Sequence, residues 1–219
     1  TILVTTVGTF LSLVMTSLFA YPLSRKDFKP RNTIAFILFF TMLFSGGMVP
    51  SYILITQYLH LQDTIWVYIL PALISPWHIF MLRTFFQGLP DAITEAALID
   101  GASEYRIFFT IILPLSKPVL ATIALFQFLS HWNSWMPSML YINRRTELYS
   151  LQYMLQKIMR DIQFMKENAG NSFVENMSEI PTETVRMATA MLVAGPALVV
   201  FPFFQKYFTR GLTVGGVKG

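Results

Sequence analysis

Five long runs without charged residues constrain this chain more than any other feature. They contain no Asp, Glu, Lys or Arg and cover residues 1–23, 33–57, 64–82, 118–143 and 187–205. A bilayer core about 30 Å thick needs roughly 20 apolar residues in a helix, so each run is long enough to cross it. A soluble core rarely contains five such runs. The sequence therefore predicts an all-α, polytopic bundle of transmembrane helices.

Composition supports this class and excludes others. Hydrophobic residues make up 54% and charged residues 13% of the chain, against about 25% charged in ordinary globular domains. The absence of cysteine excludes a disulfide scaffold and thiolate metal ligands. The three histidines lack metal-ligand spacing, and no paired carboxylates or Ser/His/Asp set indicates an enzyme. No GxxxxGK[ST] loop is present, so the chain is not expected to bind ATP itself.

The basic residues predict an orientation, because cytoplasmic loops of membrane proteins carry an excess of Lys and Arg. Loop 58–63 has none, whereas ten lie in the segments expected on the opposite side: Arg25, Lys26, Lys29, Arg31, Arg83, Arg106, Lys117, Lys206, Arg210 and Lys218. That side is predicted to be cytoplasmic, with residues 144–186 outside. Thr1 then lies outside, and the chain is expected to be the remainder of a longer one.

Helix-breaking residues interrupt several runs: Gly46, Gly47, Pro50, Pro71, Pro76, Pro137, Gly195, Pro196 and Pro202. In a membrane such breaks persist only against protein or a water-filled cavity. Two interpretations remain open at this point. The breaks are ordinary kinks at helix contacts, or they bend the spans around a translocation path.

The segment 88–117 predicts a compact cytoplasmic protrusion. Asp91 is a candidate N-cap for a short helix over 92–100, and Gly101 is its expected C′ residue. Ser103 is expected to cap a second helix that ends before Pro114. The small side chains of Ala96 and Ala97 allow close approach of a partner, and Glu95 and Asp100 offer carboxylates to basic groups on it.

These residues resemble the EAA motif of ABC-importer permeases, which reads EAA, three residues, G, nine residues, I-x-LP. All its fixed positions match: Glu95, Ala96, Ala97, Gly101, Ile111, Leu113 and Pro114. The ending QKYFTRGLTVGGVKG, the Ile99–Ala102 segment and Trp132-Asn133 are similar to carbohydrate permeases of the maltose-transporter type. Residues 112–123 most resemble the subfamily that handles complex oligosaccharides, including pectin-derived and alginate-type chains.

The resemblance covers essentially the whole chain and implies a type I ABC-importer permease. Such a subunit lies in the bacterial cytoplasmic membrane with a second permease subunit and two cytoplasmic ATPase subunits, which bind ATP and Mg²⁺. An extracytoplasmic binding protein would deliver an oligosaccharide. The implied coupling-helix residues are Glu95, Ala96, Ala97, Asp100, Gly101 and Ala102. Gly215, Gly216, Val217 and Lys218 would contact the ATPase subunits, unless the glycine-rich tail, which has little helix propensity, is a frayed terminus.

Two further groups of residues are candidates for contacts with substrate or binding protein. His131, Trp132, Asn133 and Trp135 form either a packing and interfacial aromatic group or a patch that stacks on sugar rings. Residues 147–168 predict an amphipathic external helix, either a lid on the transporter or a docking contact for the binding protein. The basic candidates for contact with the binding protein are Arg144, Arg145, Lys157 and Arg160, of which the first two precede this helix. This cluster favours an acidic sugar, although residues 144–186 are neutral in total.

Two other functions remain as alternatives. One is an ABC permease for a different solute, such as an amino acid or phosphate. The other is a secondary transporter or channel, which usually places ionisable residues within the membrane. The five runs contain none apart from His78 and His131, which counts against ion coupling, and the secondary-transporter class does not explain the EAA motif.

Overall fold

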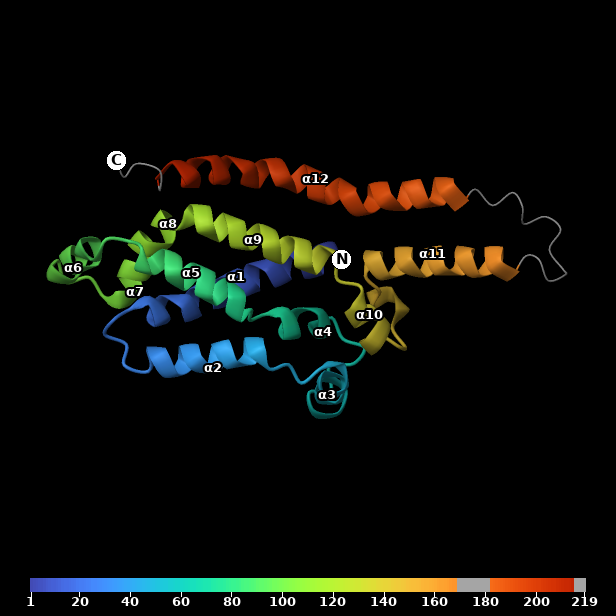
Figure 1. Cartoon of the computed structure of the whole chain (residues 1–219), viewed down its shortest axis with the longest axis horizontal. Helices are drawn as coiled ribbons and strands as arrows, with labels where there is room; N and C mark the ends of the chain where they lie inside the picture. Colours follow the sequence, from blue (N-terminus) through green and yellow to red (C-terminus); the bar gives the residue numbers. More distant parts are fainter. Residues whose placement is uncertain (169–181, 215–219) are drawn as a thin grey trace.

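The computed structural model describes residues 1–168 and 182–214, and every regular element in these ranges is a helix. The structure is an elongated bundle whose long helices run roughly side by side (Figure 1). In chain order the elements are α1 (Ile2–Ser24), α2 (Arg31–Leu43), α3 (Met48–Ile53), η1 (Leu54–Tyr58), α4 (Trp66–Ile69), η2 (Leu70–Ala72), α5 (Pro76–Gln87), α6 (Asp91–Ile99), α7 (Glu104–Ile107), η3 (Phe108–Ile112), α8 (Leu113–Leu115), α9 (Lys117–Trp132), α10 (Met136–Tyr141), η4 (Thr146–Leu148), α11 (Leu151–Asn168) and α12 (Thr182–Val214).

Helix α1 lies at the centre of the bundle and packs on α5 and α9. Its buried positions include Gly8, Ser12, Thr16 and Ala20, which recur every fourth residue and so lie on one face. Small residues on such a face let membrane helices approach closely. A Cβ atom on Gly8 would lie only 2.9 Å from the ring of His131 on α9. The α1–α9 contact therefore depends on glycine at this position.

Candidate membrane-crossing helices overlap the charge-free runs in two different ways, and one candidate extends back to Glu104, within the segment predicted to be a cytoplasmic loop. Ile2–Ser24 and Thr184–Phe203 are single helices long and apolar enough to cross a bilayer. Three further candidates are bent pairs: Arg31–Leu43 with Met48–Tyr58, Trp66–Ala72 with Pro76–Gln87, and Glu104–Leu115 with Lys117–Trp132. Their bends are 113°, 48° and 79°. In the described part of the chain there are thus up to five candidate spans.

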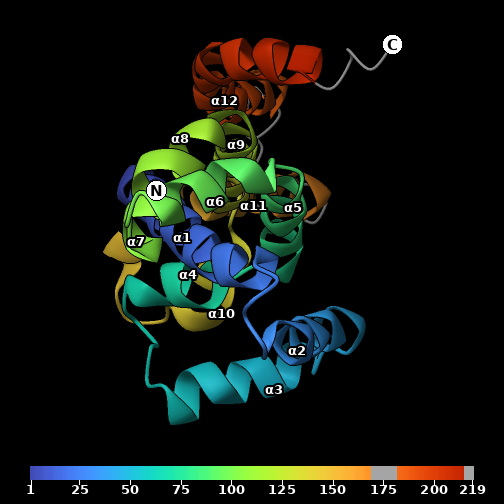
Figure 2. The ribbon, with the colours of Figure 1, turned by 90° about the vertical axis from the view of Figure 1, so that its left-hand side faces the viewer.

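The predicted helix breakers differ in their effect. The sharpest bend falls at Gly46-Gly47, where Gly47 has φ of +83°, and α3 crosses α2 at a steep angle (Figure 2). The next break comes directly before Pro76, which begins α5. By contrast, α12 continues through Gly195 and Pro196. It also continues to Val214, so the helix includes residues 206–214 of the tail despite the low helix propensity of its glycines.

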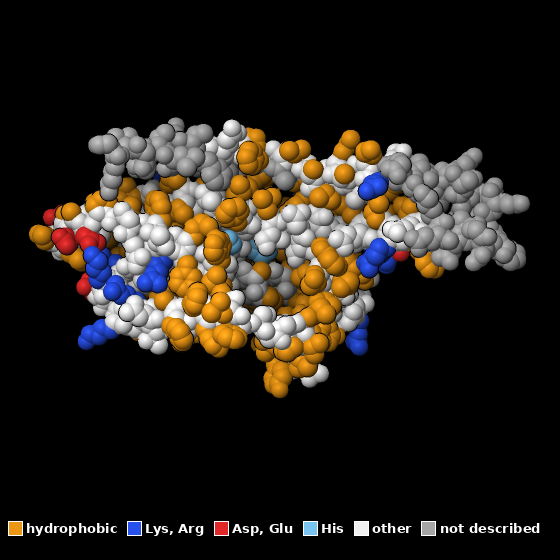
Figure 3. Space-filling model, viewed as in Figure 1, with side chains coloured by type: hydrophobic (Ala, Val, Ile, Leu, Met, Phe, Trp, Pro, Cys, Tyr) orange, Lys and Arg blue, Asp and Glu red, His pale blue; other side chains and the backbone are white. Residues whose placement is uncertain are grey.

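On the face shown in Figure 3, charged side chains lie toward the two ends of the bundle, and many apolar ones lie along its middle. The exposed side chains of α2 and α12 show this apolar surface: Phe36, Ile37, Phe40, Leu43, Met191, Leu198, Val199 and Phe203. In water such an exposed surface would be unfavourable, but in lipid it is the expected exterior. Charged ends and an apolar middle are the distribution of a membrane-spanning bundle.

Candidate functional site

The loop between α5 and α9 forms one end of the molecule, where α6 and α7 project beyond the other helices (Figure 1). Gly101 ends α6 as predicted, with φ of +76°. Its N–H donates to the carbonyl of Leu98 at 3.0 Å, and the N–H of Ala102 donates to the carbonyl of Ala97 at 3.0 Å. These two bonds are the Schellman pattern, which stops a helix and reverses the chain. Helix α6 is thereby held at a defined angle to α7.

The two helix starts in this loop differ from each other. Ser103 caps α7, as predicted, by accepting a hydrogen bond from the N–H of Arg106 at 3.4 Å. The prediction that Asp91 caps the first helix is wrong, because Pro90 is the N-cap and Asp91 is the first helical residue. The Asp91 side chain instead accepts a hydrogen bond from Lys26 at 2.7 Å. In the structure Asp91 therefore forms a long-range ion pair with Lys26 instead of the predicted local cap.

Helix α6 has one face on the bundle and one face in solvent. Thr94 and Ala97 are buried, and Ala97 belongs to the main apolar core with Ile107, Phe108 and Ile112. The EAA residues Glu95 and Ala96, and also Asp100 and Gly101, are exposed; Ala102 is half-buried. Large apolar side chains beside them are exposed as well, with Ile99 86% and Tyr105 78% accessible. An exposed apolar patch next to carboxylates is typical of a protein contact surface.

Both helices of the loop are tied to the last turn of α1 and the segment that follows it. The Tyr21 hydroxyl donates to Glu104, and Arg25 forms an ion pair with the same carboxylate at 3.2 Å. Lys26 pairs with Asp91 at the start of α6. The hydrogen bond from Lys26 lowers the pKa of the Asp91 carboxyl, and the same contact raises the pKa of Lys26. Because both partners of the Lys26–Asp91 pair are exposed, this pair orients the loop more than it stabilises the fold; in the other pair Glu104 is exposed and Arg25 is half-buried.

The candidate sugar-contact residues of α9 lie in packed surroundings. His131 and Trp132 are buried, and the Trp132 indole donates to the carbonyl of Val193 on α12 at 3.0 Å. Asn133 is exposed; its side chain donates to the Leu129 carbonyl and accepts from Gln152. Trp135 is half-buried. The structure therefore brings the four residues to one end of α9, but only Asn133 among them is exposed.

Polar pairing inside the bundle includes a residue that sequence reasoning did not assign to a site. His78 of α5 contacts the buried Gln127 of α9, with 2.8 Å between Nδ1 and Nε2. The His78 ring also stacks on Phe126. Histidine is visible in a hollowed area near the middle of the face in Figure 3. In the described residues no group of three His, Asp or Glu could hold a metal ion.

At the opposite end of the bundle, Asp63 organises the external segment. One of its carboxylate oxygens accepts hydrogen bonds from the backbone N–H groups of Asn143, Arg144 and Arg145, at 2.7, 2.9 and 3.4 Å. These bonds, that of Arg144 first, lower the pKa of Asp63. Sequence reasoning missed this contact, although a lone acid in a short loop between apolar runs was a usable signal. We call these bonds the Asp63 clamp.

The basic external candidates do not form one cluster of free charges. Arg144 and Arg145 border a polar pocket with Asp63, and Arg145 pairs with Glu147 at 2.9 Å. Lys157 and Arg160 lie exposed on α11, the predicted amphipathic helix, whose Leu155 is buried. The tail candidates Gly215, Gly216, Val217 and Lys218 lie outside the described residues.

Comparison with known proteins decides the family. Residues 4–214 match the family described as binding-protein-dependent transport system inner membrane component. The chain belongs to this family. The type I importer-permease fold and the EAA resemblance are thereby confirmed, and the chain is a transport component of a membrane rather than an enzyme. A secondary transporter or channel is accordingly excluded.

Three similar proteins are informative. The polygalacturonan/rhamnogalacturonan transport system permease protein YtcP of Bacillus subtilis (strain 168) is 40% identical over 220 residues, 100% of this chain and 75% of the relative. An arabinooligosaccharides transport system permease protein, AraQ of Halalkalibacterium halodurans, is 34% identical over 95% of this chain and 69% of its own length. A crystal structure of a bacterial ABC transporter involved in import of the acidic polysaccharide alginate matches with a TM-score of 0.79 and 32% identity, covering 94% of this chain and 72% of that one.

Proposed function

We propose that this permease subunit forms half of an alternating-access path for an oligosaccharide. The names of YtcP and AraQ and the description of the alginate importer all refer to polymeric or oligomeric sugars, which supports a sugar over an amino acid or phosphate. A second permease subunit would complete the path, and an extracytoplasmic binding protein would deliver the sugar. Two ATPase subunits, binding ATP and Mg²⁺, would drive the cycle from the cytoplasm.

The protruding α6–α7 loop is the observation that supports the coupling role most strongly. We assign contact with an ATPase subunit to Glu95, Ala96, Ala97, Asp100, Gly101 and Ala102. The small exposed Ala96 permits close approach, Glu95 and Asp100 can pair with basic groups, and exposed Ile99 adds apolar area. The bonds of Asp91 and Glu104 to the segment after α1 would transmit movement of the loop to the membrane helices. Gly215 to Lys218 are assigned to a second ATPase contact on the resemblance alone.

The outer contacts belong to the same proposal. With loop 88–117 cytoplasmic, the Asp63 clamp lies outside and presents Arg144 toward the binding protein or the arriving sugar. Lys157 and Arg160 extend this basic surface along α11. Asn133 supplies the exposed polar group among the α9 candidates, while the buried His131 and Trp132 support it by packing. Arg144 and the alginate relative both favour an acidic sugar, although Glu147 offsets the charge of Arg145.

ATP hydrolysis stimulated by the binding protein tests the substrate class. The assembled transporter, reconstituted in liposomes, is assayed with candidate binding proteins loaded with neutral oligosaccharides, acidic oligosaccharides, amino acids or phosphate. Stimulation by a sugar-loaded protein is expected, and stimulation only by an amino acid or phosphate protein would overturn the sugar assignment. Neutralising Arg144, Lys157 and Arg160 together should slow uptake of an acidic sugar more than that of a neutral one at low salt, because surface charges steer association rates. Equal slowing would assign these residues to binding-protein docking.

A further inference from the structure

A hollow of about 520 Å³ lies where the end of α1, the start of α2, the end of α5 and helix α6 meet. We call it the arginine pocket. The charged side chains that line it are Arg25, Lys26, Arg31, Arg83, Asp27, Asp91 and Glu95. Phe86, Leu98 and Ile112 form apolar parts of the same wall. The pocket thus combines cations with an apolar surface at the end of the bundle where charged side chains gather (Figure 3).

Two of the four cations in the pocket have carboxylate partners and two do not. Arg25 pairs with Glu104 and Asp27, and Lys26 pairs with Asp91. Among the side chains that the structure describes, neither Arg31 nor Arg83 has a carboxylate within 4.0 Å. Arg31 donates only to the backbone carbonyl of Arg25 at 3.3 Å. Within the described part of the chain, Arg31 and Arg83 therefore line the pocket without a carboxylate partner, against one carboxylate without a cation partner, that of exposed Glu95.

Arg83 is the most demanding of these groups. Its Nε atom is buried and has no hydrogen-bond partner among the described residues. A guanidinium stays protonated in proteins, so the group cannot escape this situation by losing its charge. A buried donor left unsatisfied is costly, and more so when it is charged. Arg83 also lines the pocket, so an anion bound there would lie beside a guanidinium that no described carboxylate neutralises.

The geometry points to the phosphate of an anionic phospholipid headgroup as the ligand of the arginine pocket. Arginine binds phosphate through two parallel N–H donors, and Arg83 and Arg31 line the pocket from two helices, α5 and α2. Basic pockets between the ends of membrane helices are known to take anionic headgroups. Phe86 and Leu98 beside the cations fit the glycerol and upper acyl chain, which a free phosphate ion would leave empty. The proposal requires that the ends of α1, α2 and α5 lie at a membrane surface, and that the side of α6 with Leu98 stays open to lipid beside the ATPase contact. It holds whatever solute is transported.

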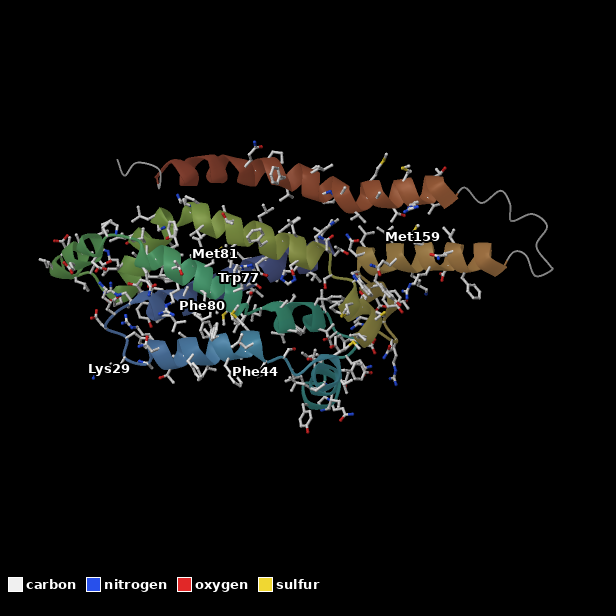
Figure 4. The ribbon with its side chains drawn as sticks, in the orientation of Figure 1. Lys29, Phe44, Trp77, Phe80, Met81 and Met159 are labelled. Atoms are coloured by element: carbon white, nitrogen blue, oxygen red, sulfur yellow. The ribbon has the colours of Figure 1, made fainter. Side chains whose placement is uncertain are left out.

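Lipid titration followed by native mass spectrometry tests the site directly. The assembled transporter in detergent micelles is titrated with dioleoyl-phosphatidylglycerol, with dioleoyl-phosphatidylcholine, or with sodium phosphate. The variants are R83Q, R31Q and R31Q/R83Q. K29Q is the matched control, because Lys29 is in the same basic loop, does not line the pocket, and points away from the molecule (Figure 4). It removes the same charge without touching the site.

Wild type and K29Q should retain one phosphatidylglycerol with the same affinity and bind phosphatidylcholine more weakly. R83Q should bind the first phosphatidylglycerol about tenfold more weakly, the loss expected when a charge-assisted hydrogen bond is removed. R31Q, which leaves Arg83 intact, should show a smaller loss. Equal weakening in K29Q and R83Q would reduce the effect to general surface charge and overturn the site. Displacement of the lipid by equimolar phosphate would overturn the lipid assignment, and so would loss of ATPase subunits in R83Q with lipid binding unchanged.

Discussion

Replacing Gly101 separates two physical reasons for a glycine in the coupling loop. Gly101 has φ of +76°, and a Cβ atom added there would meet no atom of the described residues within 4 Å. Within this chain alanine is therefore hindered by backbone conformation alone. Asparagine adopts the left-handed conformation more readily than alanine and has a larger side chain. Gly101→Ala and Gly101→Asn thus form a matched pair with opposite rankings for strain and for size.

The left-handed conformation costs a residue with a Cβ atom roughly 1–2 kcal/mol. That energy falls on the two hydrogen bonds that close α6, from Gly101 to Leu98 and from Ala102 to Ala97. A loss of this size increases the open population about 5- to 30-fold. Ala97 is buried in the core and accepts one of these hydrogen bonds. Opening of the turn therefore also frees the coupling residues from the fixed angle between α6 and α7. Gly101→Asn should lose only part of this stability.

Hydrogen exchange measures this opening directly. In the assembled transporter, the Ala102 amide of Gly101→Ala should exchange about 5–30 times faster than in wild type, and that of Gly101→Asn should lie in between. The ratio of sugar molecules imported to ATP hydrolysed should fall in the same order. Both variants should still assemble in the membrane, because Gly101 is exposed and an added Cβ atom would meet no described residue within 4 Å.

The opposite ranking would refute this reasoning. If Gly101→Asn is damaged more than Gly101→Ala, side-chain size decides, and the glycine is needed for close approach to an ATPase subunit. If transport per ATP is unchanged in both variants while exchange is faster, the rigid turn is not part of coupling.

Three further predictions follow from other contacts. Gly8→Ala places a Cβ atom 2.9 Å from the His131 ring and should destabilise the subunit by about 1–3 kcal/mol. Thermal unfolding in detergent should therefore show a lower midpoint. Gly195→Ala is the control, because its added Cβ atom meets no described residue within 4 Å, and it should not lower the midpoint. Asp63→Ala should speed amide exchange of residues 143–145 more than Asp63→Asn, whose oxygen can still accept hydrogen bonds. Because folding lowers the pKa of Asp63, the clamp stabilises the fold at pH values above the ordinary aspartate pKa of about 3.9, and this stability is lost as the pH falls through the lower pKa of the folded state. Loss of protection from amide exchange at neutral pH in wild type would therefore contradict the assignment. Cysteines replacing Lys29 and Thr146 report orientation without interference, because the chain has none; an impermeant maleimide should label Thr146→Cys on intact cells and Lys29→Cys only after permeabilisation, and the reverse pattern would invert the topology.

Local sequence determined the features whose physical cause lies within a few residues. Charge-free runs predicted the helices of a membrane bundle because a bilayer excludes ionised side chains wherever the chain crosses it. Gly101 and Ser103 predicted the end of α6 and the start of α7 because capping involves only the adjoining turn. Asp91 shows where this reasoning failed. The neighbouring residues predicted that Asp91 caps α6. In the structure, however, Asp91 forms an ion pair with Lys26, which is far away in the sequence.

Only the tertiary structure decided which distant residues meet. The Asp63 clamp joins residues about 80 positions apart, and the bond from Trp132 to Val193 joins residues 61 apart. Gly8 on one helix and His131 on another come within contact because small residues line one face of α1, and the sequence alone does not say which helix lies against that face. The buried Nε of Arg83, which has no hydrogen-bond partner among the described residues, can be recognised only once the surrounding side chains are placed. Spans and caps follow from the local preferences of the chain, whereas clamps, pockets and unpaired charges follow from packing, which depends on all the helices together.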